Sequence, residues 1–309
     1  MGISHFLIDG QKIPVEDAIS GKVPTRFPIP YLELAADFRA WDGKPHVTDL
    51  LSGIRPLWLK NKNDYAVDPD DAAYRILGIG SHARLESSGD QPGAELPLDA
   101  DEIQGRTDLL TTVNGKMSII DYKVLGSYKV QQLLGIYYED VPVLDPDGNP
   151  VFFKSGKNKG ERKTKKMLKT DPSKADVKEF ARQLNIYRYL VKLTKGVIVD
   201  DLYLFVIVRD GGTRSATERG VLFKTYTIRL PLAPEEKVIA YVEARSAEIR
   251  AYMASDNPPP MCTVEECWNG KKCQEYCEVK DFCAALGDNP FLRNNPEEKE
   301  ADSAEESGD

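Results

Sequence analysis

Long apolar runs are what this sequence lacks most clearly, because no stretch of 18 or more consecutive apolar residues occurs in it. A helix needs such a run to cross a bilayer, so we expect no membrane span. The first residues also show no basic segment followed by a long apolar stretch, and a secretory signal is therefore not expected. Together these absences predict a cytoplasmic protein without a membrane partner.

Histidine and cysteine are scarce, and their scarcity makes their positions informative. The 309 residues include three histidines and five cysteines. All five cysteines fall between Cys262 and Cys283, whereas a secreted disulfide-bonded protein would spread them through the chain. This clustering predicts a reducing compartment and a metal site. His5 and His46 have no other ligand types near them in the sequence, and we interpret both as surface or packing residues.

Two strongly charged segments stand out against a modest net charge of −8. From Glu297 to Asp309 there are seven acidic residues and one lysine, so this tail holds most of the net charge. From Lys154 to Lys169 there are eight basic residues and one glutamate. We expect a disordered acidic tail and a mobile basic stretch, which is either a solvated linker or an arm that grips phosphates.

The most informative stretch runs from Gly105 to Val124 and has the pattern of two strands joined by a tight turn at Asn114-Gly115. Asn-Gly between apolar alternating segments is the strongest short signal for a hairpin. Side chains alternate along a strand, so Asp121 and Lys123 share one face of the second strand. The sequence therefore predicts a hairpin whose second strand changes from apolar to charged.

Asp108 lies on the first strand of this hairpin and adds a second carboxylate near the same end. Like charges about 4 Å apart repel by about 4 kcal/mol at an effective dielectric constant of 20. A divalent cation removes that repulsion and can act as the centre of the chemistry. Asp108 and Asp121 therefore predict a metal site.

The apolar pattern predicts alternating helices and strands around this hairpin. We expect helices over 47–60, 68–86, 171–193 and 235–253, strands over 95–98, 201–208 and 221–230, and a further hairpin from 141–144 and 151–153. The predicted fold class is α/β. The predicted organisation is an N-terminal extension over 1–46, a core over 47–255 with a basic insertion over about 125–172, a cysteine-rich metal-binding segment over 256–293, and the tail over 294–309.

Four short motifs lie on these elements in order. They are G-S-H-A-R-L-E at 80–86, G-R-T-D at 105–108, I-I-D-Y-K at 119–123 and Q-L-N-I-Y at 183–187. In this combination the chain resembles the PD-(D/E)xK nuclease superfamily, in the RecB-like branch that includes CRISPR-associated RecB-like nucleases and the nuclease domains of AddAB-type helicase-nucleases. The resemblance covers roughly residues 47–210. It implies a restriction-endonuclease-like core, in which helices flank a small mixed sheet.

The resemblance also implies roles for the motif residues. Asp108 and Asp121 supply oxygen ligands suited to Mg²⁺ or Mn²⁺. His82 adds a nitrogen ligand that favours Mn²⁺, and the carbonyl of Tyr122 is a further ligand in the superfamily. Lys123 orients or helps to deprotonate the attacking water and offsets charge on the phosphate.

Two residues on the long helix complete the implied site. Gln183 and Tyr187 are four residues apart, so they share a face on which they position the scissile phosphate and support Lys123. Glu95 is a weaker candidate for an added ligand. The alternative to all of these roles is structural: a packed His82, a core tyrosine and a surface ion pair between the aspartate and lysine of the D-x-K motif.

The cysteine segment departs from the resemblance. Several RecB-like nucleases hold a [4Fe-4S] cluster with one cysteine before the core and three after it, but here Gly53 or a neighbour falls where the early cysteine would be. A four-thiolate site can still form within the segment. Its ligands are Cys262 or Cys267 together with Cys273, Cys277 and Cys283, and we prefer Cys262 as the first. Thiolate ligands suit Zn²⁺ or an iron–sulfur cluster almost equally, and the resemblance favours iron–sulfur.

The function that the resemblance implies is a metal-dependent DNA nuclease, an exonuclease acting in DNA recombination, repair or phage DNA processing. No helicase signature occurs, so a helicase or recombinase partner would be a separate chain. A second hypothesis is a noncatalytic DNA-binding or recombination-accessory module with the same fold. A third is a zinc-bound interaction protein whose acidic tail recruits a partner.

Overall fold

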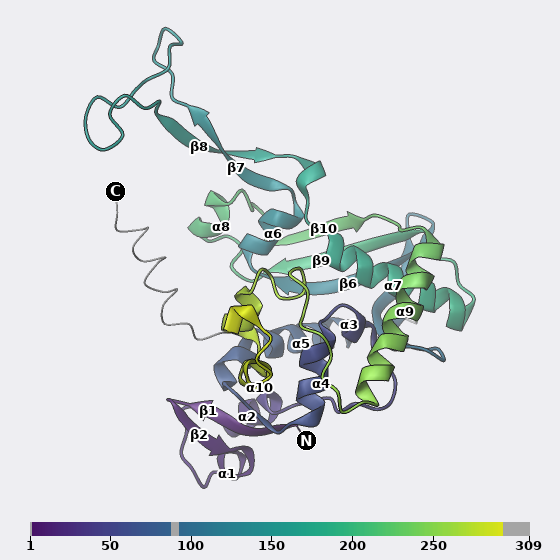
Figure 1. The fold of residues 1–309 in the computed structure, drawn as a ribbon. Coiled ribbons are helices and arrows are strands. Elements are labelled where there is room, and N and C mark those ends of the chain that lie inside the picture. Colours follow the sequence, from purple (N-terminus) through teal and green to yellow (C-terminus); the bar gives the residue numbers. More distant parts are fainter. Residues whose placement is uncertain (1, 88–92, 293–309) are drawn as a thin grey trace. The chain divides into compact units, whose positions relative to one another are not determined.

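The computed structural model describes residues 2–87 and 93–292 of the chain (Figure 1). It is a mixed α/β structure that divides into two compact units. Unit 1 comprises Met1–Gly80, Pro97–Gly105 and Glu235–Asp309, and unit 2 comprises Ser81–Leu96 and Arg106–Pro234. The prediction of a disordered acidic tail lies outside the described residues.

Unit 1 contains a three-stranded sheet with the strand order β2-β1-β3. Strand β1 (Ile3–Ile8) pairs antiparallel with β2 (Gln11–Pro14) and parallel with β3 (Tyr65–Val67). Phe6 and Leu32 are fully buried in the core beneath this sheet, and Val279 and Cys283 belong to the same core. The amino-terminal residues and the cysteine segment therefore share one hydrophobic core.

The helices of unit 1 include the predicted helix over 235–253 and the predicted helical region over 47–60, and further short helices lie in the amino-terminal residues and the cysteine segment. They are α1 (Val15–Ile19), α2 (Ile29–Ala35), α3 (Val47–Leu50), α4 (Ile54–Lys62), η1 (Pro69–Ala72), α9 (Glu235–Met253), η3 (Lys272–Tyr276), α10 (Lys280–Ala285) and η4 (Pro290–Leu292). The predicted helix over 47–60 is two helices, because the chain is extended at Gly53 and Pro56 lies in the first turn of α4.

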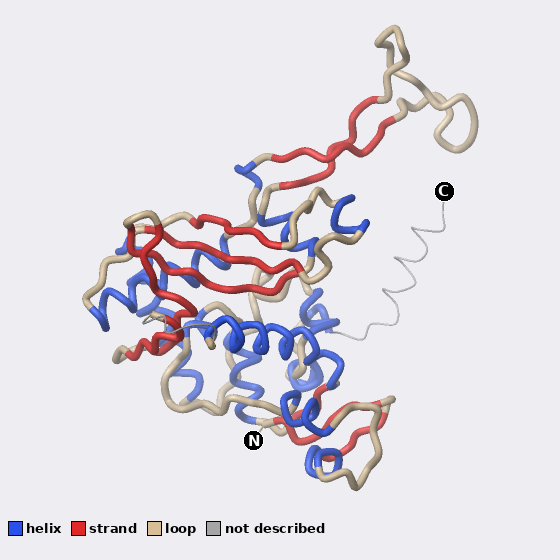
Figure 2. The backbone as a smooth tube through the Cα atoms, turned by 180° about the vertical axis from the view of Figure 1, so that it is seen from behind, coloured by secondary structure: helices blue, strands red, loops and turns tan. Residues whose placement is uncertain are grey.

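Unit 2 is built on a five-stranded sheet with the order β10-β9-β6-β5-β4. Its strands are drawn in red in Figure 2. The strands are β4 (Ala94–Asp99), β5 (Gln104–Val113), β6 (Lys116–Leu125), β9 (Asp201–Val208) and β10 (Thr225–Leu230). The predicted hairpin is confirmed as β5–β6. Its turn residues Asn114 and Gly115 have φ values of 51° and 80°, as a tight hairpin turn requires. Strand β6 also pairs parallel with β9, so the sheet is mixed.

Helix α7 (Lys178–Lys195) lies against β6 and β9 and ends at Gly196 in the left-handed conformation. Asn185 fixes this helix to the segment after β10. Its side-chain amide donates to the carbonyls of Ala181 and Pro231 at 2.8 and 2.9 Å, and its carbonyl oxygen accepts from the Ala233 N–H at 2.8 Å. Asn185 is buried, and these bonds satisfy its polar atoms.

The remaining elements of unit 2 lie before, between and after these strands. They are the end of α5 (Ala73–Glu86), α6 (Ser127–Leu133), β7 (Ile136–Pro142), β8 (Thr164–Thr170), η2 (Pro172–Lys174) and α8 (Arg214–Glu218). Strands β7 and β8 form a separate antiparallel pair. The predicted hairpin from 141–144 and 151–153 is therefore only the outer part of a longer one. Within the basic stretch, 164–169 belong to β8, a strand that the sequence pattern did not predict, and the mobility of the stretch stays a prediction.

No helix within residues 2–87 and 93–292 is long and apolar enough to cross a membrane.

Candidate active site and cysteine segment

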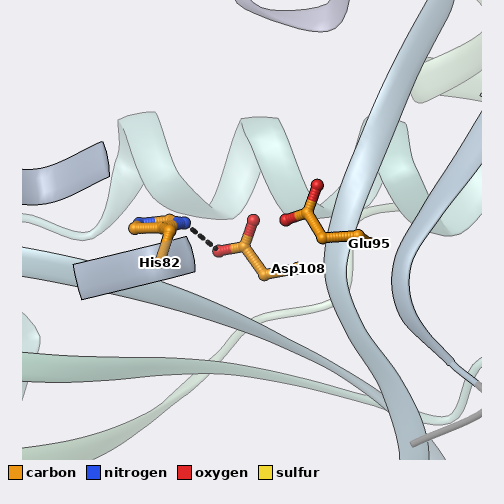
Figure 3. A group of neighbouring side chains, drawn as sticks. All are labelled: His82, Glu95 and Asp108. Atoms are coloured by element: carbon orange, nitrogen blue, oxygen red, sulfur yellow. Dashed lines mark ion pairs between the residues drawn. The ribbon is translucent and has the colours of Figure 1, made fainter. Parts of the chain in front are cut away.

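Three side chains from three elements of unit 2 form a candidate metal site (Figure 3). His82 comes from α5, Glu95 from β4 and Asp108 from β5. One ligand atom from each lies within 4.8 Å of the other two, and all three side chains are partly buried. The Asp108 carboxylate lies between the other two groups, with one oxygen 3.5 Å from His82 Nδ1. One nitrogen and two carboxylates are a donor set suited to Mn²⁺ or Mg²⁺.

The site lies where the sheet opens between β5 and β6. Their antiparallel pairing ends at Leu109 and Ile120, one residue short of Asp108 and Asp121. Beyond this point the N–H of Tyr122 donates to the side-chain carboxylate of Asp108 on β5, at 2.7 Å, instead of to a backbone carbonyl. The side chain of Asp108 therefore takes over a hydrogen bond that the sheet no longer supplies, which fixes its direction.

Neighbouring rings hold His82 in place. Its imidazole packs edge-on against the Tyr122 ring at 6.2 Å, and Tyr122 in turn packs edge-on against Phe205 of β9. The hydrogen bond to Asp108 raises the pKa of His82, although burial acts in the opposite direction. A metal ion would require the neutral imidazole, so binding at this nitrogen would compete with protonation.

Asp121 and Lys123 share one face of β6, as predicted, and form a close ion pair of 2.6 Å. Asp121 is 2 % exposed, and burial raises the pKa of its carboxyl to about 6, with the Lys123 ammonium opposing the shift. The same carboxylate oxygen has no partner in good hydrogen-bond geometry among the described residues. The cation that this buried carboxylate faces in the structure is the Lys123 ammonium.

Gln183 and Tyr187 lie on the buried face of α7, and their side chains are hydrogen-bonded to each other. Burial raises the pKa of the Tyr187 phenol, and the negative charges of Asp121 and Asp108 raise it further. Tyr187 is therefore a neutral donor beside the carboxylates. The predicted placement of this pair on one helical face is confirmed.

The structure brings most of the predicted site residues into one region but arranges them differently. His82 and Asp108 converge, whereas Asp121 lies outside the 4.8 Å group and faces Lys123 instead. Glu95 takes the third position. The Tyr122 N–H donates a hydrogen bond to Asp108. That the Tyr122 carbonyl is a metal ligand stays a prediction.

A backbone feature explains how Glu95 reaches this position. The chain passes so close to β5 at Gly93 that a Cβ there would lie 1.8 Å from the Leu110 carbonyl oxygen. Glu95 itself has a φ of 46°, which is rare for a residue other than glycine. Its carboxylate also pairs with Arg106 at 3.0 Å. In the sequence, only the glycine two residues earlier gave a signal for this close approach.

The cysteines lie in unit 1 and are all free thiols. Burial raises the pKa of Cys262 to about 12, and burial also raises the pKa of Cys273 and Cys277. The thiols of Cys267, Cys277 and Cys283 also raise the pKa of Cys273, whereas the hydrogen bond from Asn289 lowers it. Yet no three of the sulfurs, all in the described part of the chain, lie within 4.8 Å of one another.

That separation bears on the choice of metal. Four thiolates on one zinc ion, at about 2.3 Å each, bring their sulfurs within about 4 Å of one another. Ligands of a four-iron cluster bind different irons, so their sulfurs lie further apart. The described cysteines therefore do not form a closed four-sulfur site for a single zinc ion in this arrangement.

Gly53 explains how Cys262 reaches this region. A Cβ on Gly53 would lie 2.4 Å from the Cys262 sulfur, so only glycine leaves room for it. Cys262 therefore occupies the space beside the position at which the resemblance places an early cysteine.

Polar groups surround two of the other thiols. The Asn289 amide donates to the sulfurs of Cys283 and Cys273 at 3.4 and 3.7 Å. Arg55 lies 3.8 Å from the Cys283 sulfur and forms a bidentate pair with Asp288. Donors of this kind stabilise thiolate-bound clusters and tune them.

No family model matches the chain, and no curated protein matches it significantly.

Proposed function

We propose that the chain is a metal-dependent deoxyribonuclease with a restriction-endonuclease-like core, of the RecB-like PD-(D/E)xK type. The observation that carries this proposal is the convergence of His82, Glu95 and Asp108 beside a buried Asp121–Lys123 pair, at the point where β5 and β6 separate. This arrangement supplies metal ligands and an ammonium within one region of unit 2.

Each residue has a task in phosphodiester hydrolysis. His82, Glu95 and Asp108 would hold Mg²⁺ or Mn²⁺, with Asp121 completing the set. The ion would polarise the phosphate and lower the pKa of a bound water. Lys123 orients that water and offsets the negative charge that develops on the phosphate. The Gln183–Tyr187 pair holds the phosphate with neutral donors, which position it without adding charge.

The cysteine segment supports a second part of the proposal. Cys262, Cys273, Cys277 and Cys283 would hold a [4Fe-4S] cluster, and Zn²⁺ is the alternative. Cys283 belongs to the core that includes Phe6 and Val279, so the group would stabilise the fold of unit 1.

The context that the resemblance implies is exonuclease action in DNA recombination, repair or phage DNA processing, with a helicase or recombinase on a separate chain. One observation favours the alternative of a noncatalytic DNA-binding module. Asp121 is paired with Lys123 and lies outside the ligand group, an arrangement that a structural ion pair would also show.

A cleavage assay separates these alternatives. Labelled single- and double-stranded DNA is incubated with the full chain in Mn²⁺, Mg²⁺ or a chelator, together with Asp108→Asn and Lys123→Ala. Asp101→Asn and Lys12→Ala, at exposed positions, are the matched controls. We expect metal-dependent cleavage by the wild type and the controls only. DNA binding without cleavage under any of these conditions would establish the noncatalytic module instead.

A further inference from the structure

The β7–β8 hairpin and its tip, residues 136–170, form an arm that extends away from the five-stranded sheet of unit 2 (Figures 1 and 2). Every residue of β8 is exposed, and β7 is exposed over Tyr138–Asp140. Further bridges, between Leu144 and Pro150 and between Phe152 and Arg162, continue the pairing toward the tip. A two-stranded hairpin without a core is only marginally stable alone, so internal packing does not account for this arm.

The base of the arm is fixed to unit 2. The Tyr138 hydroxyl donates to the Glu218 carbonyl at 2.7 Å. At Gly220, a Cβ would lie 3.3 to 3.4 Å from Ile136 and Leu168, so the glycine lets these side chains pack closely. The Asp171 N–H also donates to the Gly135 carbonyl at 2.9 Å, which closes the base. These contacts at the base therefore fix the direction in which the arm leaves unit 2.

The charges of the arm are divided between its two halves. The outgoing half, 136–150, contains only acidic charged residues, whereas 154–169 carries eight basic residues and one glutamate. Lys169 forms an ion pair with Glu139 at 3.6 Å, and Lys163 lies over the Phe153 ring. The basic residues of the arm that form neither an ion pair nor a ring contact with any described residue are Lys154, Lys159, Arg162, Lys165 and Lys166.

We infer that the returning half of the arm binds the phosphate backbone of duplex DNA outside the cleavage site. This inference rests on the proposed function for the choice of DNA. The arm follows β6 through α6, so it leaves the same unit that carries Asp121 and Lys123.

Three properties of the arm fit a duplex better than an acidic protein segment. Its unpaired cations are spread along an extended strand and loop, and duplex DNA presents about one charge per 1.7 Å of its axis. Strand β8 alone extends about 20 Å, enough to follow several phosphates. The exposed Phe152 near the tip offers an apolar contact to a sugar or base edge.

A salt titration of DNA binding tests the inference. The full chain carrying Lys123→Ala is titrated with a labelled 30-base-pair duplex without divalent metal, so that the DNA stays intact. The arm variant adds four substitutions by glutamine, at Lys154, Lys159, Lys165 and Lys166. The charge-matched control makes the same change at four exposed lysines elsewhere, Lys12, Lys195, Lys224 and Lys237.

We expect the arm variant to bind at least about tenfold more weakly at low salt, with the slope of log K against log salt reduced by up to about 0.9 for each lost phosphate contact. The control should keep the wild-type slope. Equal slopes for the arm variant and the wild type, or an equal loss in both variants, would overturn the inference.

Cleavage distinguishes this inference from the proposed function. With Lys123 intact, the arm variant should cleave a saturating short substrate at the wild-type rate in Mn²⁺. A chain that binds duplex DNA through the arm but cleaves nothing would remove the nuclease proposal and leave the arm assignment in place.

Discussion

The carboxylate site in unit 2 and the cysteine segment in unit 1 are both candidate metal sites, and they differ in how far the chain alone assembles them. His82, Glu95 and Asp108 come from a helix and two strands and converge within 4.8 Å. The cysteines lie within a short stretch of turns and short helices, and no three of their sulfurs, all among the described residues, approach so closely. Regular elements can bring hard-cation ligands together without the ion, whereas the thiol segment would need a bound metal or cluster to bring its sulfurs together.

The sharpest test of the preformed site is Asp108→Asn. This change keeps the side-chain shape but removes the central ligand charge, and we expect cleavage to fall by about 1,000-fold or more. The melting temperature of the metal-free protein should change little. A loss of folding instead of activity, measured by circular dichroism, would show that Asp108 is structural.

The cysteine segment is tested by moving one ligand. Cys262→Ala should lose iron and sulfide to the level of Cys283→Ala, because one of four thiolates is missing. Cys267→Ala should keep both. Since Gly53 lies against the Cys262 sulfur, adding Gly53→Cys to Cys262→Ala should restore the visible absorbance of anaerobically purified protein. If the purified wild type contained zinc and no iron, the segment would hold a single zinc ion and the prediction of a cluster would be wrong.

A smaller effect is expected for the buried Asp121 in metal-free protein. Its pKa is raised to about 6 in the folded state, so the folded chain binds the proton more tightly than the unfolded chain. Folding stability is therefore lost as pH rises from about 4 to about 6. Asp121→Asn should be more stable than wild type at pH 7, by up to about 3 kcal/mol, with no difference near pH 4.

Chemical denaturation at both pH values measures this effect, with Asp101→Asn as the control. Adding Mn²⁺ should stabilise the wild type and Asp101→Asn more than Asp121→Asn. A pH-independent difference would mean that the carboxyl of Asp121 is not held in its neutral form.

The smallest expected effect concerns the outermost ligand. Glu95→Gln removes one charge beside Asp108 but leaves the other two ligands, so we expect about 10- to 100-fold weaker Mn²⁺ affinity, with cleavage recovered at high Mn²⁺. The Mn²⁺ concentration for half-maximal cleavage measures this shift. An unchanged Mn²⁺ requirement would place Glu95 outside the metal site, as only a partner of Arg106.

The sequence predicted what depends on local pattern. The Asn114-Gly115 turn determined the hairpin register, and strand alternation placed Asp121 beside Lys123. The position of Glu95 depends on a long-range approach of backbone at Gly93, which no local pattern encodes. Strand β8 was missed because its lysines hide the alternation that identifies a strand with a buried face. The contact of Gly53 with Cys262 likewise joins residues far apart in the chain.

The hydrogen bonds between Asn185 and the segment after β10 limit how the site can respond to a cation. Because Asn185 joins α7 to Pro231 and Ala233 after β10, rotation of the helix about its axis would break two buried hydrogen bonds. Gln183 and Tyr187 therefore form the stationary wall of the site. Adjustment around a bound ion would then have to come from the elements that carry the ligands, α5 with His82, β4 with Glu95 and β5 with Asp108.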